Sequence, residues 1–148
     1  MTSEVDSIST VEEMTAVDAN DLWLRDPTAQ LIDVRTRAEW TYVGAPTPVA
    51  GCTPIFCEWQ SYPDMQIRAG FVAELTAELA ARGVGPTAPL LFLCRSGVRS
   101  RAAAQAMRAA GYQRCVNITE GFQGPPDGNG HRSRVSGWQA AGLPWRQG

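Results

Sequence analysis

The stretch Leu90-Leu91-Phe92-Leu93-Cys94-Arg95-Ser96-Gly97-Val98-Arg99-Ser100 joins an apolar run to a short polar loop. The run Pro89–Leu93 has the length of a β-strand that is buried on both faces. Directly after the loop, Arg101–Ala110 (RAAAQAMRAA) is rich in helix formers and is followed by Gly111. The sequence therefore predicts Cys94 at the carboxyl end of a strand, facing a helix whose N-cap is Ser100.

Cys94 is predicted to be a catalytic nucleophile. Unpaired backbone N–H groups and the positive end of the helix dipole favour bound anions and the thiolate form of a cysteine. Gly97 can adopt a positive φ that lets successive N–H groups converge. A free cysteine is often a small core residue, but this one is followed by poor core sequence. We expect an anionic substrate to be bound by the rest of the loop, which consists of Arg95, Ser96, Gly97, Val98, Arg99 and Ser100.

Strand-like and helix-like segments alternate along the chain, which predicts an α/β fold with helices on both faces of a parallel sheet. Strands are expected at 16–17, 30–34, 54–58, 89–93 and 114–118. Helices are expected at 19–24 with Asp18 as N-cap, from the cap Thr36 to Thr41, at 71–82 and at 101–110.

Asp33 and Arg35 lie at the end of the second predicted strand, so they could support the site from the same side as Cys94. We favour a structural role for both residues. Asp33 would accept hydrogen bonds from loop N–H groups, and Arg35 would pair with Glu39 four residues later.

Two motifs resemble the rhodanese (thiosulfate sulfurtransferase-like) family. Residues 94–100 (CRSGVRS) look like its six-residue active-site loop, and 31–40 (LIDVRTRAEW) look like its N-terminal signature. The segments 111–122 and 138–145 are similar to later parts of the family, so the resemblance covers residues 15–146. It implies a three-layer sandwich around a mostly parallel sheet of about five strands. It also implies that Cys94 carries sulfane sulfur as a persulfide, from a small anionic donor such as thiosulfate to cyanide or a thiol.

The chain departs from the family pattern in two places. Val43-Gly44-Ala45-Pro46 replaces a Gly-His-Ile-Pro segment and lacks its histidine, and residues 123–137 form a longer, Pro- and Gly-rich insertion. The insertion is read as a solvated loop, with a lid or partner surface as the alternative. We expect residues 1–14 to be a flexible segment before a single domain at 15–146.

Composition and charge argue against several other classes of function. A net charge of −2 over 148 residues gives no basic field for nucleic acid, and no apolar run is long enough for a membrane span. The polar, acidic start lacks the pattern of a secretory signal, so we expect a cytoplasmic protein. Cys52, Cys57, Cys94 and Cys115 show no CxxC spacing and the chain has one histidine, so neither a metal nor an organic cofactor is expected.

Other readings of the thiol stay open. A reactive thiolate also suits a non-enzymatic persulfide carrier that acts with a sulfur-relay protein, or a redox-sensing thiol. A cysteine-dependent phosphatase or arsenate reductase is disfavoured, because those loops place an arginine six positions after the cysteine, where this chain has Ser100.

Overall fold

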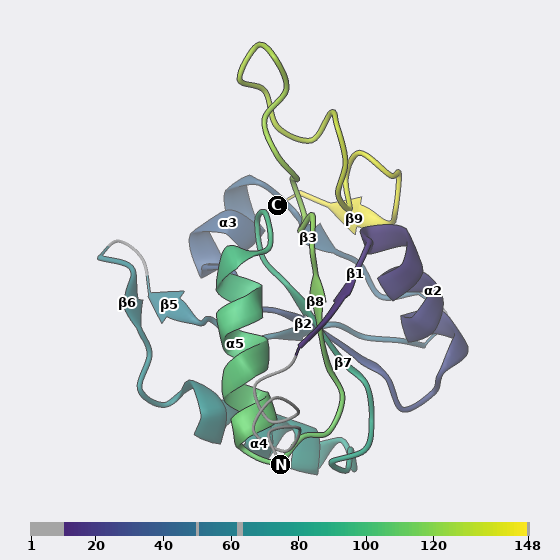
Figure 1. Cartoon of the computed structure of the whole chain (residues 1–148), viewed down its shortest axis with the longest axis vertical. Helices are drawn as coiled ribbons and strands as arrows, with labels where there is room; N and C mark the ends of the chain where they lie inside the picture. The colour runs from purple at the N-terminus through teal and green to yellow at the C-terminus, as the bar shows by residue number, and fades with distance from the viewer. Residues whose placement is uncertain (1–10, 50, 62–63, 148) are drawn as a thin grey trace, which may run out of the picture.

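The computed structural model describes residues 11–49, 51–61 and 64–147. A five-stranded sheet, in which every neighbouring pair is parallel, forms the centre of the fold (Figure 1). In spatial order its strands are β1 (Glu12–Met14), β8 (Cys115–Ile118), β7 (Leu90–Leu93), β2 (Gln30–Asp33) and β4 (Ile55–Phe56). Two antiparallel pairs lie beside it: β3 (Ala45–Pro46) with β9 (Trp145–Arg146), and β5 (Gln60–Ser61) with β6 (Gln66–Ile67).

Helices cover both faces of the sheet. Helices α4 (Phe71–Ala81) and α5 (Val98–Ala109) pack on one face, and α2 (Ala16–Arg25) packs on the other together with Trp138 from the C-terminal segment (Figure 1). The short helix α3 (Arg37–Tyr42) follows β2. This arrangement confirms the predicted three-layer α/β sandwich.

Side chains along β7 alternate between the two faces, as in any β-strand. Leu90 and Phe92 contribute to the core beneath α4 and α5, and Cys94 continues that series just beyond the strand. Leu91 and Leu93 contribute to the core beneath α2. The buried tetrapeptide therefore sets the face on which the Cys94 side chain lies.

The amino-terminal elements differ from the prediction. The first strand is Glu12–Met14 rather than 16–17, and α2 begins at Ala16 because the Thr15 side chain accepts a hydrogen bond from the backbone N–H of Asp18. Asp18 is thus not the N-cap. Within the segment 1–14, which was expected to be flexible, Glu12–Met14 form β1 and pair with β8, and residues 1–10 lie outside the described residues.

Helix α5 begins before its predicted start. Gly97 is its N-cap, with φ of 106°, and Ser100 lies inside the first turn instead of capping it. Helix α3 follows the prediction closely: Thr36 caps it, and the Glu39 side chain accepts a hydrogen bond from the Thr36 backbone N–H in a capping box. The strand predicted at 54–58 is shorter, at Ile55–Phe56, and helix α4 ends at Ala81.

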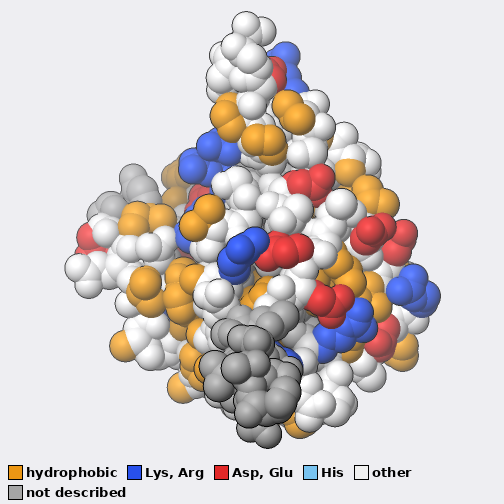
Figure 2. All heavy atoms as spheres, in the orientation of Figure 1, with side chains coloured by type: hydrophobic (Ala, Val, Ile, Leu, Met, Phe, Trp, Pro, Cys, Tyr) orange, Lys and Arg blue, Asp and Glu red, His pale blue; other side chains and the backbone are white. Residues whose placement is uncertain are grey.

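The insertion at 123–137 projects beyond the carboxyl ends of the strands (Figure 1). Its base is fixed by hydrogen bonds from the backbone N–H groups of Gln123 and Gly124 to Arg95 O, at 3.0 and 3.2 Å. On the molecular face shown in Figure 2, acidic and basic side chains are interspersed. None of the helices in the described part of the chain has the length and apolar character that a membrane span requires.

Candidate functional site

The Cys94 sulfur is surrounded by polar groups of the loop that follows it. The residue is 1% exposed. The backbone N–H of Gly97 donates to Cys94 Sγ over 3.1 Å, and Ser100 Oγ lies 3.2 Å from the same atom. Two of the predicted loop residues, Gly97 and Ser100, therefore donate to the Cys94 sulfur, which favours negative charge there.

Gly97 is required by two features of its position. Its φ of 106° is rarely adopted by residues with a side chain. A Cβ atom at this position would lie 2.4 Å from the carbonyl oxygen of Thr119, so no larger residue fits without displacing the backbone. The loop therefore packs directly against the backbone of Thr119, the residue that follows β8.

Asn117 supports the loop from β8, and sequence reasoning did not assign it this role. Its amide nitrogen donates to Gly97 O over 3.0 Å and to Glu13 Oε1 over 2.9 Å. Its Oδ1 atom therefore faces Ser100 Oγ, at 2.5 Å. One feature of the sequence could have identified Asn117: it is a polar residue within a strand whose other residues are apolar and buried.

Segment 121–124 holds the other side of the loop. The backbone N–H of Phe122 donates to Cys94 O over 2.7 Å. A Cβ atom on Gly121 would lie 2.5 Å from the carbonyl carbon of Arg95. The loop backbone is thus fixed from both sides by the chain that follows β8.

Arg99 does not present a free guanidinium group. Its Nη1 and Nη2 atoms donate to the two carboxylate oxygens of Glu39, over 2.7 and 2.9 Å. Burial acts to raise the pKa of the Glu39 carboxyl, but the hydrogen bonds and charge of Arg99 outweigh it and lower that pKa to about 2. The other loop cation, Arg95, is exposed.

Arg35 does not pair with Glu39 as expected. It forms a buried ion pair with Asp33, with Nη2 2.8 Å from Oδ2, and its guanidinium group lies over the Phe122 ring at 4.1 Å. Asp33 accepts the backbone N–H of Arg35 over 3.1 Å, in line with its predicted role. Because Arg35 lies between β2 and the Thr36 cap of α3, and its side chain is buried, the helix spacing rule does not apply to it.

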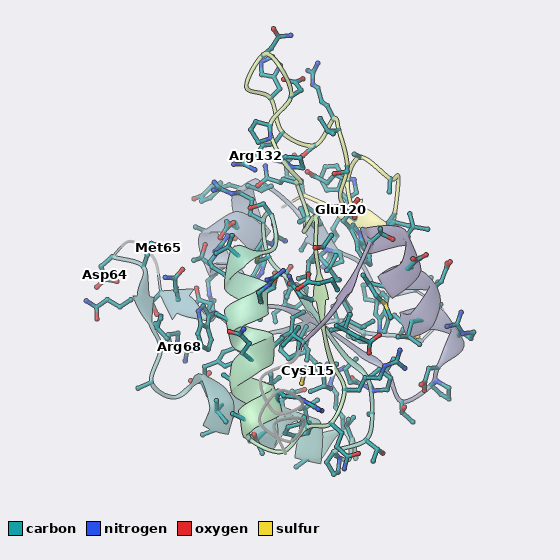
Figure 3. The ribbon with its side chains drawn as sticks, viewed as in Figure 1. Asp64, Met65, Arg68, Cys115, Glu120 and Arg132 are labelled. Atoms are coloured by element: carbon teal, nitrogen blue, oxygen red, sulfur yellow. The ribbon has the colours of Figure 1, made fainter. Side chains whose placement is uncertain are left out.

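Ser96 and Val98 are less buried than Gly97 and Ser100. The Val98 side chain is 79% exposed, and Ser96 is half-buried. A cavity of about 540 Å³ opens beside the loop, between α3 and the β5–β6 hairpin. Arg95 and Arg99 line it from the loop, Gln123 from the insertion, and Met65, labelled in Figure 3, from the hairpin.

The other three cysteines lie outside residues 94–100, and Cys57 belongs to the same core cluster as Cys94. Burial raises the pKa of Cys57 to about 11 and that of Cys115 to about 12. Cys115 (Figure 3) pairs with Leu90, at the opposite end of β7 from Cys94. Cys52 is half-buried, with its sulfur 3.9 Å from Trp23 O. Within 11–49, 51–61 and 64–147, no cluster of His, Cys, Asp or Glu side chains could hold a metal ion.

The Rhodanese-like domain family matches residues 16–124. The chain belongs to this family. The rhodanese-like chain is 33% identical over 136 residues to an uncharacterised protein of Rickettsia conorii, covering 92% of this chain and 98% of that protein. The crystal structure of Rv0390 from M. tuberculosis superposes with a TM-score of 0.82 at 40% identity, covering 95% of this chain and all of that one.

More distant structures share the fold of this rhodanese-like protein. The polysulfide-sulfur transferase homodimer from Wolinella succinogenes gives a TM-score of 0.58 at 22% identity, covering 99% of this chain and 87% of that one. The family match confirms the resemblance that the two sequence motifs indicated. Strand β1 and most of the C-terminal insertion lie outside the family match.

Proposed function

We propose that this protein is a sulfurtransferase that carries sulfane sulfur as a persulfide on Cys94. The observation that supports the proposal best is the pair of contacts to Cys94 Sγ, from Gly97 N at 3.1 Å and Ser100 Oγ at 3.2 Å. Such donors stabilise a sulfur anion, which both the attacking thiolate and the ionised persulfide contain. The pocket chemistry needs no metal or organic cofactor.

The reaction would proceed in two displacements. The Cys94 thiolate attacks the outer sulfur of an anionic donor such as thiosulfate, the S–S bond breaks, and sulfite leaves with the bonding electron pair. Cyanide or a thiolate then attacks the outer sulfur of the Cys94 persulfide and departs as thiocyanate or as a new persulfide. The Cys94 thiolate is regenerated, and the acceptor could equally be a cysteine of a sulfur-relay protein.

Phosphate chemistry is not favoured by this site. A phosphatase loop of this type uses an arginine fork on the phosphate oxygens. Here both terminal nitrogens of Arg99 donate to Glu39. The free thiols of Cys52, Cys57, Cys94 and Cys115 fit a reducing compartment, and we infer the cytoplasm.

Intact-mass spectrometry tests the proposal. After incubation with thiosulfate, the wild-type protein should gain the mass of one sulfur atom, and cyanide should remove it with formation of thiocyanate. Cys94→Ser should gain nothing, whereas Cys52→Ser, which alters a half-buried thiol away from the loop, should behave as wild type. A sulfur adduct on Cys94→Ser would contradict the proposal.

A further inference from the structure

Strand β1 brings a carboxylate to the network that surrounds the active-site loop. Glu13 lies outside residues 16–124, which match the Rhodanese-like domain family. In the parallel pairing of β1 with β8 (Figure 1), Glu13 is the register partner of Asn117. Glu13 Oε1 accepts from Asn117 Nδ2 over 2.9 Å and from Thr119 Oγ1 over 2.8 Å. Glu13 Oε2 lies 2.6 Å from Arg101 Nη2, so the carboxylate also forms an ion pair with α5.

The orientation of the Asn117 amide is decided by its two acceptors. Asn117 Nδ2 carries two hydrogens, and they go to Glu13 Oε1 and to Gly97 O. A reversed amide would set Asn117 Oδ1 against a carboxylate oxygen and a carbonyl oxygen, neither of which can donate. Asn117 Oδ1 must therefore face Ser100 Oγ, at 2.5 Å.

This orientation makes Asn117 a competitor of the Cys94 sulfur. The Ser100 hydroxyl has one hydrogen, and both Asn117 Oδ1 and Cys94 Sγ are within reach of it. When Cys94 gives its proton to the solvent, the Ser100 hydrogen can stabilise the thiolate only by leaving Asn117 Oδ1 without a donor. Asn117 is 1% exposed, and an unpaired acceptor at a buried position is costly. The fixed amide therefore reduces what Ser100 contributes to the sulfur anion.

We propose that Glu13 is a positioning residue that restrains the reactivity of Cys94, because it holds the Asn117 amide in the orientation that competes for the Ser100 hydrogen. The inference rests on the proposed function, in which the Cys94 thiolate is the attacking group. Without Glu13, only Gly97 O would oppose a reversed amide. The reversed amide would donate from Nδ2 to Ser100 Oγ, and the Ser100 hydrogen would pass to the sulfur.

The rate of Cys94 alkylation, followed by peptide mapping, tests this role without depending on sulfur transfer. The Cys94 thiolate attacks the methylene carbon of iodoacetamide, the C–I bond breaks, and iodide leaves with the electron pair. Glu13→Ala should raise the rate constant at about pH 6 roughly tenfold, because the thiolate gains a stronger hydrogen bond. Glu13→Gln should keep the wild-type rate, because its amide oxygen can still accept from Asn117 Nδ2. Salt at about 1 M screens the change of charge in both variants.

Two control variants separate the contact with Asn117 from other effects of the substitution. Glu12→Ala removes the neighbouring carboxylate of β1, which pairs with Arg114 on the surface. Arg101→Ala removes the ion pair of Glu13 but leaves its hydrogen bond with Asn117. Both controls should be alkylated at the wild-type rate, and urea unfolding shows whether each variant is folded.

A double-mutant cycle shows whether Glu13 acts through Ser100. In Ser100→Ala the hydrogen for which Asn117 competes is gone, so adding Glu13→Ala should change the alkylation rate less than about twofold. An equal rise in that background would show that the substitution only opens access to the sulfur, and it would overturn the inference. A raised rate in Glu13→Gln would overturn it as well.

Persulfidation by thiosulfate, measured on the same variants, keeps the inference apart from the proposed function. Glu13→Ala should form the Cys94 persulfide faster than the wild type at the same pH, and only while Ser100 is present. If the wild type forms a persulfide but Glu13→Ala is alkylated at the wild-type rate, the inference alone is overturned. If neither the wild type nor any variant forms a persulfide, the proposed function is overturned, and the inference falls with it.

Discussion

Ser100 Oγ lies 2.5 Å from Asn117 Oδ1 and 3.2 Å from Cys94 Sγ. The Ser100 hydroxyl has one hydrogen, so it can donate to only one of these two atoms at a time. The amide of Asn117 cannot turn to offer a donor instead, because its nitrogen already donates to Gly97 O and Glu13 Oε1. When Cys94 is a thiol, its S–H can donate to Ser100 Oγ while the Ser100 hydroxyl donates to Asn117 Oδ1. When the sulfur is anionic, the hydroxyl hydrogen turns to it.

Ser100→Ala should slow Cys94 persulfidation by about 10- to 100-fold, because a hydrogen bond to a charged group contributes roughly 1.5–3 kcal/mol. The variant removes one of the two donors to the sulfur and leaves the Gly97 N–H in place. Rapid-quench mass spectrometry measures the rate, and urea unfolding shows whether the variant is folded. A folded variant with the wild-type rate would show that this hydroxyl does not act on the sulfur anion.

Gly97→Ala should destabilise the protein by about 2–4 kcal/mol and abolish persulfidation, because its Cβ would lie 2.4 Å from Thr119 O. Gly111→Ala is the matched control, since Gly111 has a similar φ of 112° but no atom within 4 Å of the added carbon. Gly111→Ala should lower the free energy of unfolding by only about 1–2 kcal/mol and should still form the Cys94 persulfide. Equal losses of stability in the two variants, measured by urea unfolding, would rule out the close approach as the cause.

The Glu39–Arg99 pair should contribute stability that depends on pH. The pKa of Glu39 is lowered from 4.5 to about 2 in the folded protein, so the carboxylate stabilises the fold fully above about pH 4.5 and loses this effect as the pH falls through 2. The lowered pKa alone would correspond to about 3 kcal/mol at neutral pH, and solvent screening of this partly exposed pair reduces that to roughly 1–2 kcal/mol. The free energies of unfolding of wild type and Glu39→Gln should therefore differ most at pH 7 and converge only near pH 2, and a difference that does not change with pH would contradict the pairing.

Cys57 and Cys115 should resist alkylation in the native protein. Burial holds their pKa values at about 11 and 12, so at pH 7 they are thiols with almost no thiolate. Peptide mapping after brief treatment with iodoacetamide should find label on Cys94 before either of them, and on every cysteine in urea. Labelling of native Cys115 at the rate of Cys94 would refute this order.

Local signals explain why the strand, the loop and α3 could be predicted. The apolar tetrapeptide of β7 and the Thr36–Glu39 capping box are each decided by residues within a few positions of one another. β1 could not be recognised in this way. Its sequence, Glu-Glu-Met, has little strand character, and it is a strand because it pairs in parallel with β8, about a hundred residues later.

The contacts that complete the site are equally remote in sequence. Glu39 pairs with Arg99 sixty positions away, whereas the spacing of four residues suggested Arg35 as its partner. Asn117 reaches Gly97 and Ser100 only because β8 lies beside β7 in the sheet. The contacts of Gly97 and Ser100 with Cys94 could be expected from the loop's own residues, but the groups that hold the loop in place or pair with Arg99 depend on the topology.

The alternation of side chains along β7 makes the site sensitive to the length of the strand. Leu90 is held in register by Gln30 on one side and Cys115 on the other. One residue inserted within β7 would turn the thiol toward α2 and bring a leucine side chain beneath the N-terminus of α5. An insertion of two residues would restore the orientation. Substitutions in β7 should therefore be tolerated far better than the insertion or deletion of an odd number of residues.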